Sequence, residues 1–296
     1  MVIGTPNHSV SRAVKLVLKA QATQDGAGVS LYRAIGNPAL QEIDPFLLLD
    51  EIHSGRPADY AAGFPLHPHR GFETLSYIVH GRMRHRDSRG NEGIIESGGI
   101  QWMSAARGIL HSEIPDQDGG LFWGYQLWIN LPAAKKMDEP KYSGIPAERI
   151  PTLALKDNGF IKVIAGEDIT DQPGPVVRGD IDLVFLDVYL PPHARLFQPL
   201  PKEHTVFAYL ADGEVEFGCG SCNSPALIRD RTVVVFDAGD HVSAITEDSD
   251  ARFLLIAGQP LDEPIARQGP FVMNTKDEID QANLDYKNGS MYKPEL

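Results

Sequence analysis

Residues 67–81 read HPHRGFETLSYIVHG. In a β-strand, side chains two positions apart point to the same face, so His67 and His69 present two imidazoles to one point. His111 and Glu113 repeat this spacing later in the chain and can supply a third imidazole and a carboxylate from a neighbouring strand. Three imidazoles and one carboxylate suit a divalent transition metal such as iron, with positions left for exogenous ligands. The chain is therefore predicted to carry one metal site on β-strands.

The carboxylate of this site has two candidates. Glu73 and Glu113 both have the strand parity that lets them face the histidines, so spacing alone does not separate them. The residue that is not a ligand is expected to orient one of the histidines.

Short strands separated by turns are predicted along the whole chain. It contains 28 glycines and 22 prolines, and brief apolar runs lie between them. Such a pattern is typical of β-sandwiches and β-barrels, so an all-β fold is expected. Residues 131–151, LPAAKKMDEPKYSGIPAERIP, are polar and rich in proline. We therefore expect a first domain at 1–134 with the metal site, a linker at 135–150 and a second domain at 151–296 without metal.

The two halves resemble each other. A shift of 132 residues aligns Tyr77 with Tyr209 and Gly81 with Gly213. In this alignment every proposed ligand is matched by a residue that does not bind metal in the same way. This predicts that the second half is a degenerate copy of the first, without a metal site. The aligned pairs are His67 with Pro199, His69 with Pro201, His111 with Ser243 and Glu113 with Ile245.

The motifs resemble those of a known family. The spacings around His67 and His111 are similar to the two cupin motifs, although Ala106 stands where a proline is usual. The resemblance to the pirin family is closer, with Leu66 as a departure from the acidic residue common there. The matching segments are FLLLDE at 46–51, HPHRGFET at 67–74, QWMSAARGILHSE at 101–113, QLWINLP at 126–132 and GPFVMNTKDEI at 269–279.

This resemblance implies a bicupin: two antiparallel double-stranded β-helix barrels, jelly-roll-like, with few short helices. It implies one iron site, Fe(II) or Fe(III), although Zn, Ni, Mn and Cu are compatible with the same donors. The ligands that it implies are His67, His69, His111 and Glu113, with Glu73 as the alternative carboxylate.

The resemblance also implies an activity, that of a quercetin 2,3-dioxygenase. Such an enzyme takes a small phenolic substrate and O₂, removes the proton of the flavonol 3-hydroxyl, opens the central ring and releases carbon monoxide. Glu113 or Glu73 would act as the base. The alternative is an iron- and redox-dependent regulatory protein that binds a transcription factor or a metabolic enzyme.

Bulk properties argue against two other classes. The net charge of -13 and the pI near 5.2 disfavour direct nucleic-acid binding, and no apolar run is long enough for a membrane span. We expect a cytoplasmic protein, nuclear as well if the source is eukaryotic. The basic run from Arg82 to Arg89 is interpreted as a solvated hairpin, and Cys219 and Cys222 as a turn with a redox pair as the alternative.

Overall fold

The computed structural model describes residues 9–166, 171–176, 182–218 and 226–292, and the regular secondary structure of these residues is almost entirely β-strand. The expected all-β class is confirmed. Cys219 and Cys222 lie outside the described residues. Among the described residues, no helix is both long enough and apolar enough to cross a bilayer.

The chain divides into two compact units, and neither is contiguous in sequence. Each combines a central segment with a terminal segment that the expected division, 1–134 and 151–296, placed in the other domain. One unit contains the described residues up to Ala20 and those from Ile150 to Pro260, and the other contains Gln21–Arg149 and the described residues from Leu261 onward. The reason is long-range pairing. The strand Val14–Lys19 lies antiparallel to Thr232–Phe236, which local sequence patterns do not reveal.

The first of these, unit 1, is built on antiparallel strands with apolar side chains inside. Its main sheet has the order β1-β19-β17-β21-β15-β14-β13, and β16, β18 and β20 pair off this path. A short 3₁₀ turn, η4, spans Lys156–Asn158. The strands are β1 (Val14–Lys19), β13 (Thr152–Ala154), β14 (Phe160–Ala165), β15 (Leu183–Leu190), β16 (Arg195–Pro199), β17 (Thr205–Phe217), β18 (Ala226–Arg229), β19 (Thr232–Phe236), β20 (His241–Ile245) and β21 (Ala251–Gly258).

Unit 2 contains two facing sheets and the predicted metal residues. Their strand orders are β5-β10-β7-β8 and β12-β9-β6-β11-β4-β3-β2, all antiparallel. The strands are β2 (Gln21–Asp25), β3 (Val29–Ile35), β4 (Phe46–Ser54), β5 (Phe64–His69), β6 (Phe72–His80), β7 (Met83–Asp87), β8 (Glu92–Ile95), β9 (Ile100–Ser104), β10 (Ile109–Pro115), β11 (Phe122–Asn130) and β12 (Lys141–Ile145), with 3₁₀ turns η1 (Pro57–Asp59), η2 (Ala133–Lys135) and η3 (Ala147–Arg149).

The expected linker is partly a strand. β12 lies between Pro140 and Pro146 and forms the edge of the larger sheet of unit 2, where it pairs with β9. The prolines flank β12 and do not interrupt it, so they leave its ladder hydrogen bonds intact.

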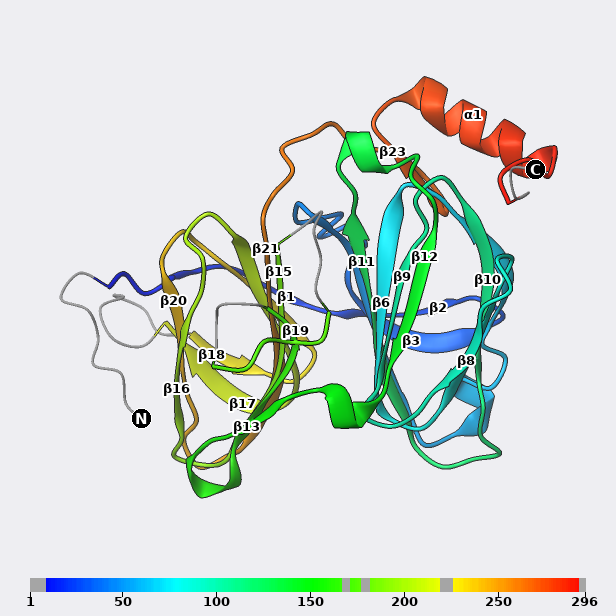
Figure 1. The fold of residues 1–296 in the computed structure, drawn as a ribbon. Coiled ribbons are helices and arrows are strands. Elements are labelled where there is room, and N and C mark those ends of the chain that lie inside the picture. Colours follow the sequence, from blue (N-terminus) through cyan, green and yellow to red (C-terminus); the bar gives the residue numbers. More distant parts are fainter. Residues whose placement is uncertain (1–8, 167–170, 177–181, 219–225, 293–296) are drawn as a thin grey trace. The chain divides into compact units, whose positions relative to one another are not determined.

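The C-terminal segment packs on unit 2 beside the metal motifs. It forms the hairpin β22 (Ala266–Gln268) and β23 (Phe271–Met273), then helix α1 (Lys276–Lys287), drawn in orange and red in Figure 1. The predicted capping box of Thr275 and Glu278 is confirmed. This segment ends the second half of the sequence but belongs to the unit that contains His67.

The attachment of this segment begins at the turn that follows β5. Arg70 exchanges backbone hydrogen bonds with Pro270 and Val272, and its guanidinium binds Asp285 of α1 at 2.7 Å. Gly71 has φ +88°, and a Cβ there would lie 1.8 Å from the Val272 carbonyl oxygen. Only glycine fits this position.

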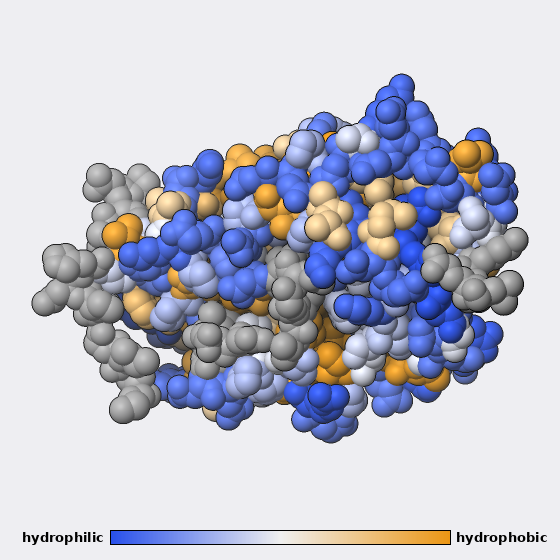
Figure 2. Space-filling model, turned by 45° about the horizontal axis from the view of Figure 1, so that its top comes forward, coloured by the Kyte–Doolittle hydropathy of each residue, from blue (hydrophilic) through white to orange (hydrophobic). Residues whose placement is uncertain are grey.

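Figure 2 shows hydrophilic residues over most of the face drawn, with apolar residues in scattered patches. The basic run forms the hairpin β7–β8, as interpreted from the sequence. Its arginines each have a carboxylate partner: Arg82 and Arg84 with Asp116, Arg86 with Glu92 and Arg89 with Glu139.

Candidate metal centre

Two neighbouring strands bring three histidines together. β5 pairs with β10 so that His111 lies opposite His67, and His69 lies opposite Ile109. The ring centroid of His67 is 4.6 Å from that of His69 and 4.4 Å from that of His111. The ring centroids of His69 and His111 are 4.8 Å apart. One nitrogen from each ring lies within 4.8 Å of the others, so the three can share one metal ion.

The hydrogen bond of His67 fixes its tautomer. Its Nδ1 is 2.7 Å from the carbonyl oxygen of Pro65, and a carbonyl only accepts, so Nδ1 carries the proton. The other ring nitrogen, Nε2, points toward His69, whose Nε2 is 3.0 Å away. A carbonyl on the far nitrogen is the usual way to orient a metal-binding imidazole.

His111 is the central residue of the cluster. It is fully buried, and neither of its ring nitrogens has a hydrogen-bond partner. Burial, together with the neighbouring histidines, lowers the pKa of His111 well below its ordinary value, and burial beside His67 does the same to the pKa of His69. Both rings are therefore neutral at pH 7 and offer lone pairs to a metal. A buried polar group without a partner costs stability, which a bound metal would offset.

We expect the pH dependence of stability to report these buried imidazoles. The pKa of His111 is lower in the folded metal-free protein than in the unfolded chain. Below about pH 6.5 the unfolded chain therefore binds a proton that the folded protein does not. The free energy of unfolding should decrease as the pH is lowered through this range. Asp50, whose pKa burial raises to about 6, acts in the opposite direction.

A comparison with His111→Leu isolates the contribution of His111. The free energy of unfolding of the metal-free wild type should fall relative to that of His111→Leu by up to about 1.4 kcal/mol per pH unit below pH 6.5. Urea unfolding over this range measures the difference. A constant difference would contradict a buried neutral His111.

Glu113 is buried close to His111 but is held by other donors. The Ser76 hydroxyl and the Gln101 amide donate to its Oε1 at 2.8 and 2.9 Å, and the Gln126 amide donates to Oε2. Glu113 is not part of the His67, His69 and His111 group. Its carboxylate lies instead within 4.8 Å of ligand atoms of His111 and His85, which form a second group with it.

Glu73 is also buried, but it belongs to neither group. It lies on β6 of the larger sheet, opposite Ser104 of β9 and Ile129 of β11. On β6, Ser76 faces Glu113, and Glu73, three positions earlier, lies on the opposite face of the strand, so the expected parity of Glu73 was wrong.

His85 is a buried residue of this centre that the sequence interpretation missed. It lies on β7 opposite Glu113 of β10, and its ring centroid is 5.5 Å from that of His111. A signal was present in the sequence. Arg84 and Arg86 alternate on the exposed face of the hairpin, so His85 between them must point inward.

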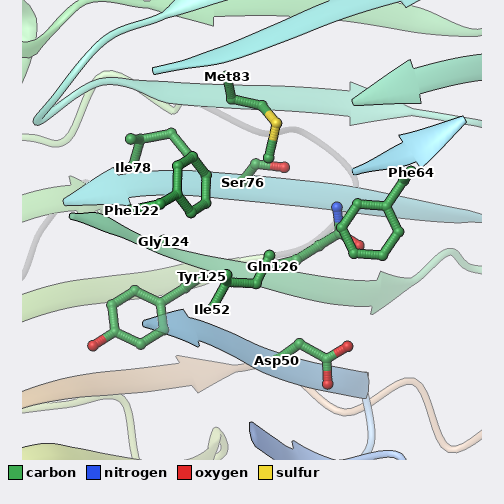
Figure 3. Close-up of a pocket in the computed structure, with 10 residues that line it drawn as sticks. All are labelled: Asp50, Ile52, Phe64, Ser76, Ile78, Met83, Phe122, Gly124, Tyr125 and Gln126. Atoms are coloured by element: carbon green, nitrogen blue, oxygen red, sulfur yellow. The ribbon is translucent and has the colours of Figure 1, made fainter. Parts of the chain in front are cut away.

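A narrow cavity adjoins Glu113 through Ser76 and Gln126. Figure 3 shows Phe64 and Asp50 near Gln126, and an apolar group of Ile78, Phe122 and Met83 at the other side. Its volume is about 20 Å³, about the space of one water molecule. The complete lining is Asp50, Ile52, Phe64, Ser76, Ile78, Met83, Phe122, Gly124, Tyr125 and Gln126.

Aromatic side chains pack against His69. The ring of Trp128 is 5.0 Å from that of His69 and stacks on Phe72 at 4.3 Å. The indole N–H of Trp128 donates to Gln126 Oε1 at 3.2 Å, which orients the amide that binds Glu113. Arg267, from the C-terminal segment, lies over the indole at 5.1 Å.

The described part of unit 1 contains no comparable group of metal-binding side chains. Its strands β16 and β20 are antiparallel, as β5 and β10 are in unit 2, and they carry Pro199 and Ser243, which align with His67 and His111 in sequence. Ser243 lies opposite Phe197, however, whereas His111 lies opposite His67. That the second half binds no metal stays a prediction.

Two models of protein families match the chain, one in each half of the sequence. The family model described as Pirin matches residues 28–129, and the model described as Pirin C-terminal cupin domain matches residues 185–292. A pirin-like protein from Caulobacter vibrioides is 42% identical over 280 residues, which cover 94% of this chain and 98% of that protein.

Solved structures confirm the expected bicupin fold. A crystal structure of quercetin 2,3-dioxygenase from Acinetobacter baumannii matches with a TM-score of 0.86 and 33% identity, over 95% of this chain and 99% of that one. A bacterial pirin from Escherichia coli in complex with nickel(II) matches with a TM-score of 0.62 and 21% identity, over 83% of this chain and 100% of that one, which shows a shared fold.

Proposed function

The chain belongs to the pirin family. We propose that it is a metal-dependent dioxygenase that opens the central ring of flavonols such as quercetin with O₂. The observation that carries the proposal is the convergence of His67, His69 and His111, with both nitrogens of His111 buried and without partners. The likeness to a solved quercetin 2,3-dioxygenase supports the substrate class.

The residues present fit a transition metal. His67, His69 and His111 would hold it through neutral imidazole nitrogens, and Glu113 would complete the set after a change of side-chain conformation. Iron is the proposed ion. Nickel, manganese, zinc and copper accept the same donors, and the nickel(II) complex of the Escherichia coli pirin makes nickel the first alternative to test. When bound, the metal supplies Lewis acidity and access to O₂ chemistry.

Glu113 is the proposed base for the flavonol 3-hydroxyl. Its carboxylate receives three hydrogen bonds, from Ser76, Gln101 and Gln126, and all three groups are neutral donors. A carboxylate within reach of the substrate hydroxyl can accept its proton. The amides of Gln101 and Gln126 fix the direction of the oxygens in the arrangement in which Glu113 is not a metal ligand.

The cavity beside Glu113 must widen before it can take a flavonol. Its volume matches a single water molecule, whereas sites for small organic ligands usually measure several hundred Å³. Phe64 is half-buried at one side of the cavity, and the thioether of Met83 is flexible, so these two side chains are the proposed points of opening.

Turnover tests the proposal. Protein reconstituted with Fe(II), and separately with Ni(II), is mixed with quercetin in air, and loss of flavonol absorbance is followed together with carbon monoxide. We expect turnover with at least one metal. It should fall by at least about 100-fold in His67→Ala and in His111→Ala, because a catalytic metal supplies several kcal/mol.

His80→Ala is the matched control for these variants. His80 lies at the exposed end of β6, and its Nδ1 is 2.9 Å from the Leu121 carbonyl oxygen. This variant should retain wild-type turnover. Equal turnover in wild type and in His111→Ala would contradict the proposal, as would the absence of turnover with iron, nickel, manganese, zinc and copper.

A further inference from the structure

We propose a second cation seat in unit 2, formed by His85, His111 and Glu113. Ligand atoms of these three residues lie within 4.8 Å of one another, and all three residues are buried. The seat spans two adjacent strands, because His85 of β7 lies directly opposite Glu113 of β10. It shares His111 with the first seat, which consists of His67, His69 and His111.

His85 offers a free nitrogen to this seat. Its Nε2 is 3.2 Å from a carboxylate oxygen of Asp87, and a carboxylate accepts, so Nε2 carries the proton. The other ring nitrogen, Nδ1, is buried without a hydrogen-bond partner. Stacking on Tyr142, with centroids 4.4 Å apart and an angle of 13°, fixes the ring. A carboxylate on one imidazole nitrogen commonly prepares the other nitrogen for a metal.

His111 can serve this seat in place of the first. Both Nδ1 and Nε2 are buried and without partners, and a neutral imidazole has one lone pair, so His111 can ligate an ion in one seat at a time. Hydrogen bonds to neighbouring residues do not compete for either atom. The shared ring therefore connects two groups of donors.

The electric charge of the interior also favours a cation. The side chains of Asp87 and Glu113 are buried, and the hydrogen-bond partners of Glu113 are neutral. Asp87 binds His85, the Asn91 amide and backbone N–H groups. Within the described ranges, neither carboxylate forms an ion pair with lysine or arginine. Buried carboxylates without a cation are costly, and a divalent ion would offset both charges.

The donor set selects the class of ion. Two imidazole nitrogens and one carboxylate suit divalent transition ions such as zinc, cobalt, nickel and ferrous iron, whereas calcium and magnesium prefer oxygen donors. An ion in the second seat uses His111 and Glu113, both of which the proposed dioxygenase needs. Excess metal is therefore expected to compete with the active arrangement.

Cobalt(II) binding tests the second seat. The double variant His67→Ala/His69→Ala removes two ligands of the first seat and leaves the second intact. In equilibrium dialysis followed by metal analysis, we expect it to retain one cobalt per chain, with a visible d–d absorption spectrum. Adding His85→Phe keeps a ring on Tyr142 and removes the nitrogens. Cobalt affinity should then fall by at least about 10-fold, the smallest loss typical of groups in a metal site.

Two controls complete the experiment. His80→Phe, added to the same double variant, should leave cobalt binding unchanged. If His85→Phe does not fold, as judged by thermal melting, Glu113→Gln in the double variant removes the carboxylate charge from the same seat and should weaken binding similarly.

The proposal is overturned if the double variant binds no stoichiometric cobalt, or if its binding is indifferent to His85→Phe and to Glu113→Gln. Metal binding by the wild type and its turnover of quercetin test the proposed function separately, so the two can fail independently.

Discussion

Replacing His111 by leucine is expected to abolish stoichiometric metal binding to the first seat and to make the metal-free protein more stable. The wild-type ring buries two nitrogens without partners, and an unsatisfied buried polar group costs about 1–3 kcal/mol. Leucine has nearly the same size and no polar atom, and its repacking cost is below about 1.5 kcal/mol. The free energy of unfolding without metal should therefore rise by about 1 kcal/mol.

With metal bound, the wild type should be more stable than His111→Leu. At a free metal concentration about 1,000 times the Kd, binding adds about 4 kcal/mol to the wild type and nothing to the variant. Urea unfolding with chelator and with metal measures both effects on the same two proteins. A variant that is less stable than wild type without metal, and that still gains stability from metal, would contradict the assigned role of His111.

Replacing Lys136 by methionine is expected to give the largest loss of stability, about 4 kcal/mol. Lys136 is 1% exposed, and its ammonium donates to the Asn130 side chain at 2.6 Å and to the carbonyls of Gly71 and Val272 at 2.7 and 3.0 Å. Burial lowers its pKa to about 8, so it is still charged at pH 7 and all three protons are used. Methionine removes three hydrogen bonds and leaves three buried acceptors unpaired.

The same bonds join the turn after β5 to β23 of the C-terminal segment. Lys136→Met should therefore also loosen that segment, seen as faster hydrogen exchange at residues 271–273. Lys135→Met is the matched control, because Lys135 is half-exposed and its ion pair with Asp138 lies at the surface. Its loss should cost less than about 1 kcal/mol. Equal effects of the two variants would contradict the buried role of Lys136.

The sequence predicted the histidine cluster because the evidence for it is local. His67 and His69 share one strand face through the two-residue period of β-structure, and the resemblance to pirins brought His111 to the same place. The repeat of Tyr77 and Gly81 at Tyr209 and Gly213 likewise needs no long-range information. Gly81 and Gly213 both have positive φ, at 103° and 85°.

Other features depend on pairings between distant residues. β1 pairs with β19 more than 200 positions away, and Arg70 pairs with the backbone at Pro270 and Val272. Strand periodicity gives the face of a side chain but not the neighbouring strand, so the exchanged terminal segments could not be foreseen. Glu73 shows the same limit: it shares β6 with Ser76, which donates to Glu113, but positions 73 and 76 lie on opposite faces of the strand.

The donors around Glu113 and the role of His85 were hidden for a different reason. Gln101 and Gln126 stand inside the quoted motifs, but their amides acquire meaning only when β9 and β11 approach β10 in space. His85 was read as one member of a basic run, although the alternation of that run already placed it on the inner face.

Anomalous diffraction from a crystal of the metal-loaded protein shows whether the three histidines hold one ion. At the absorption edge of the bound ion, we expect one strong peak within bonding distance, about 2.0–2.2 Å, of one nitrogen each from His67, His69 and His111. A loaded crystal without such a peak, or with a peak that none of these three nitrogens reaches, would contradict this expectation.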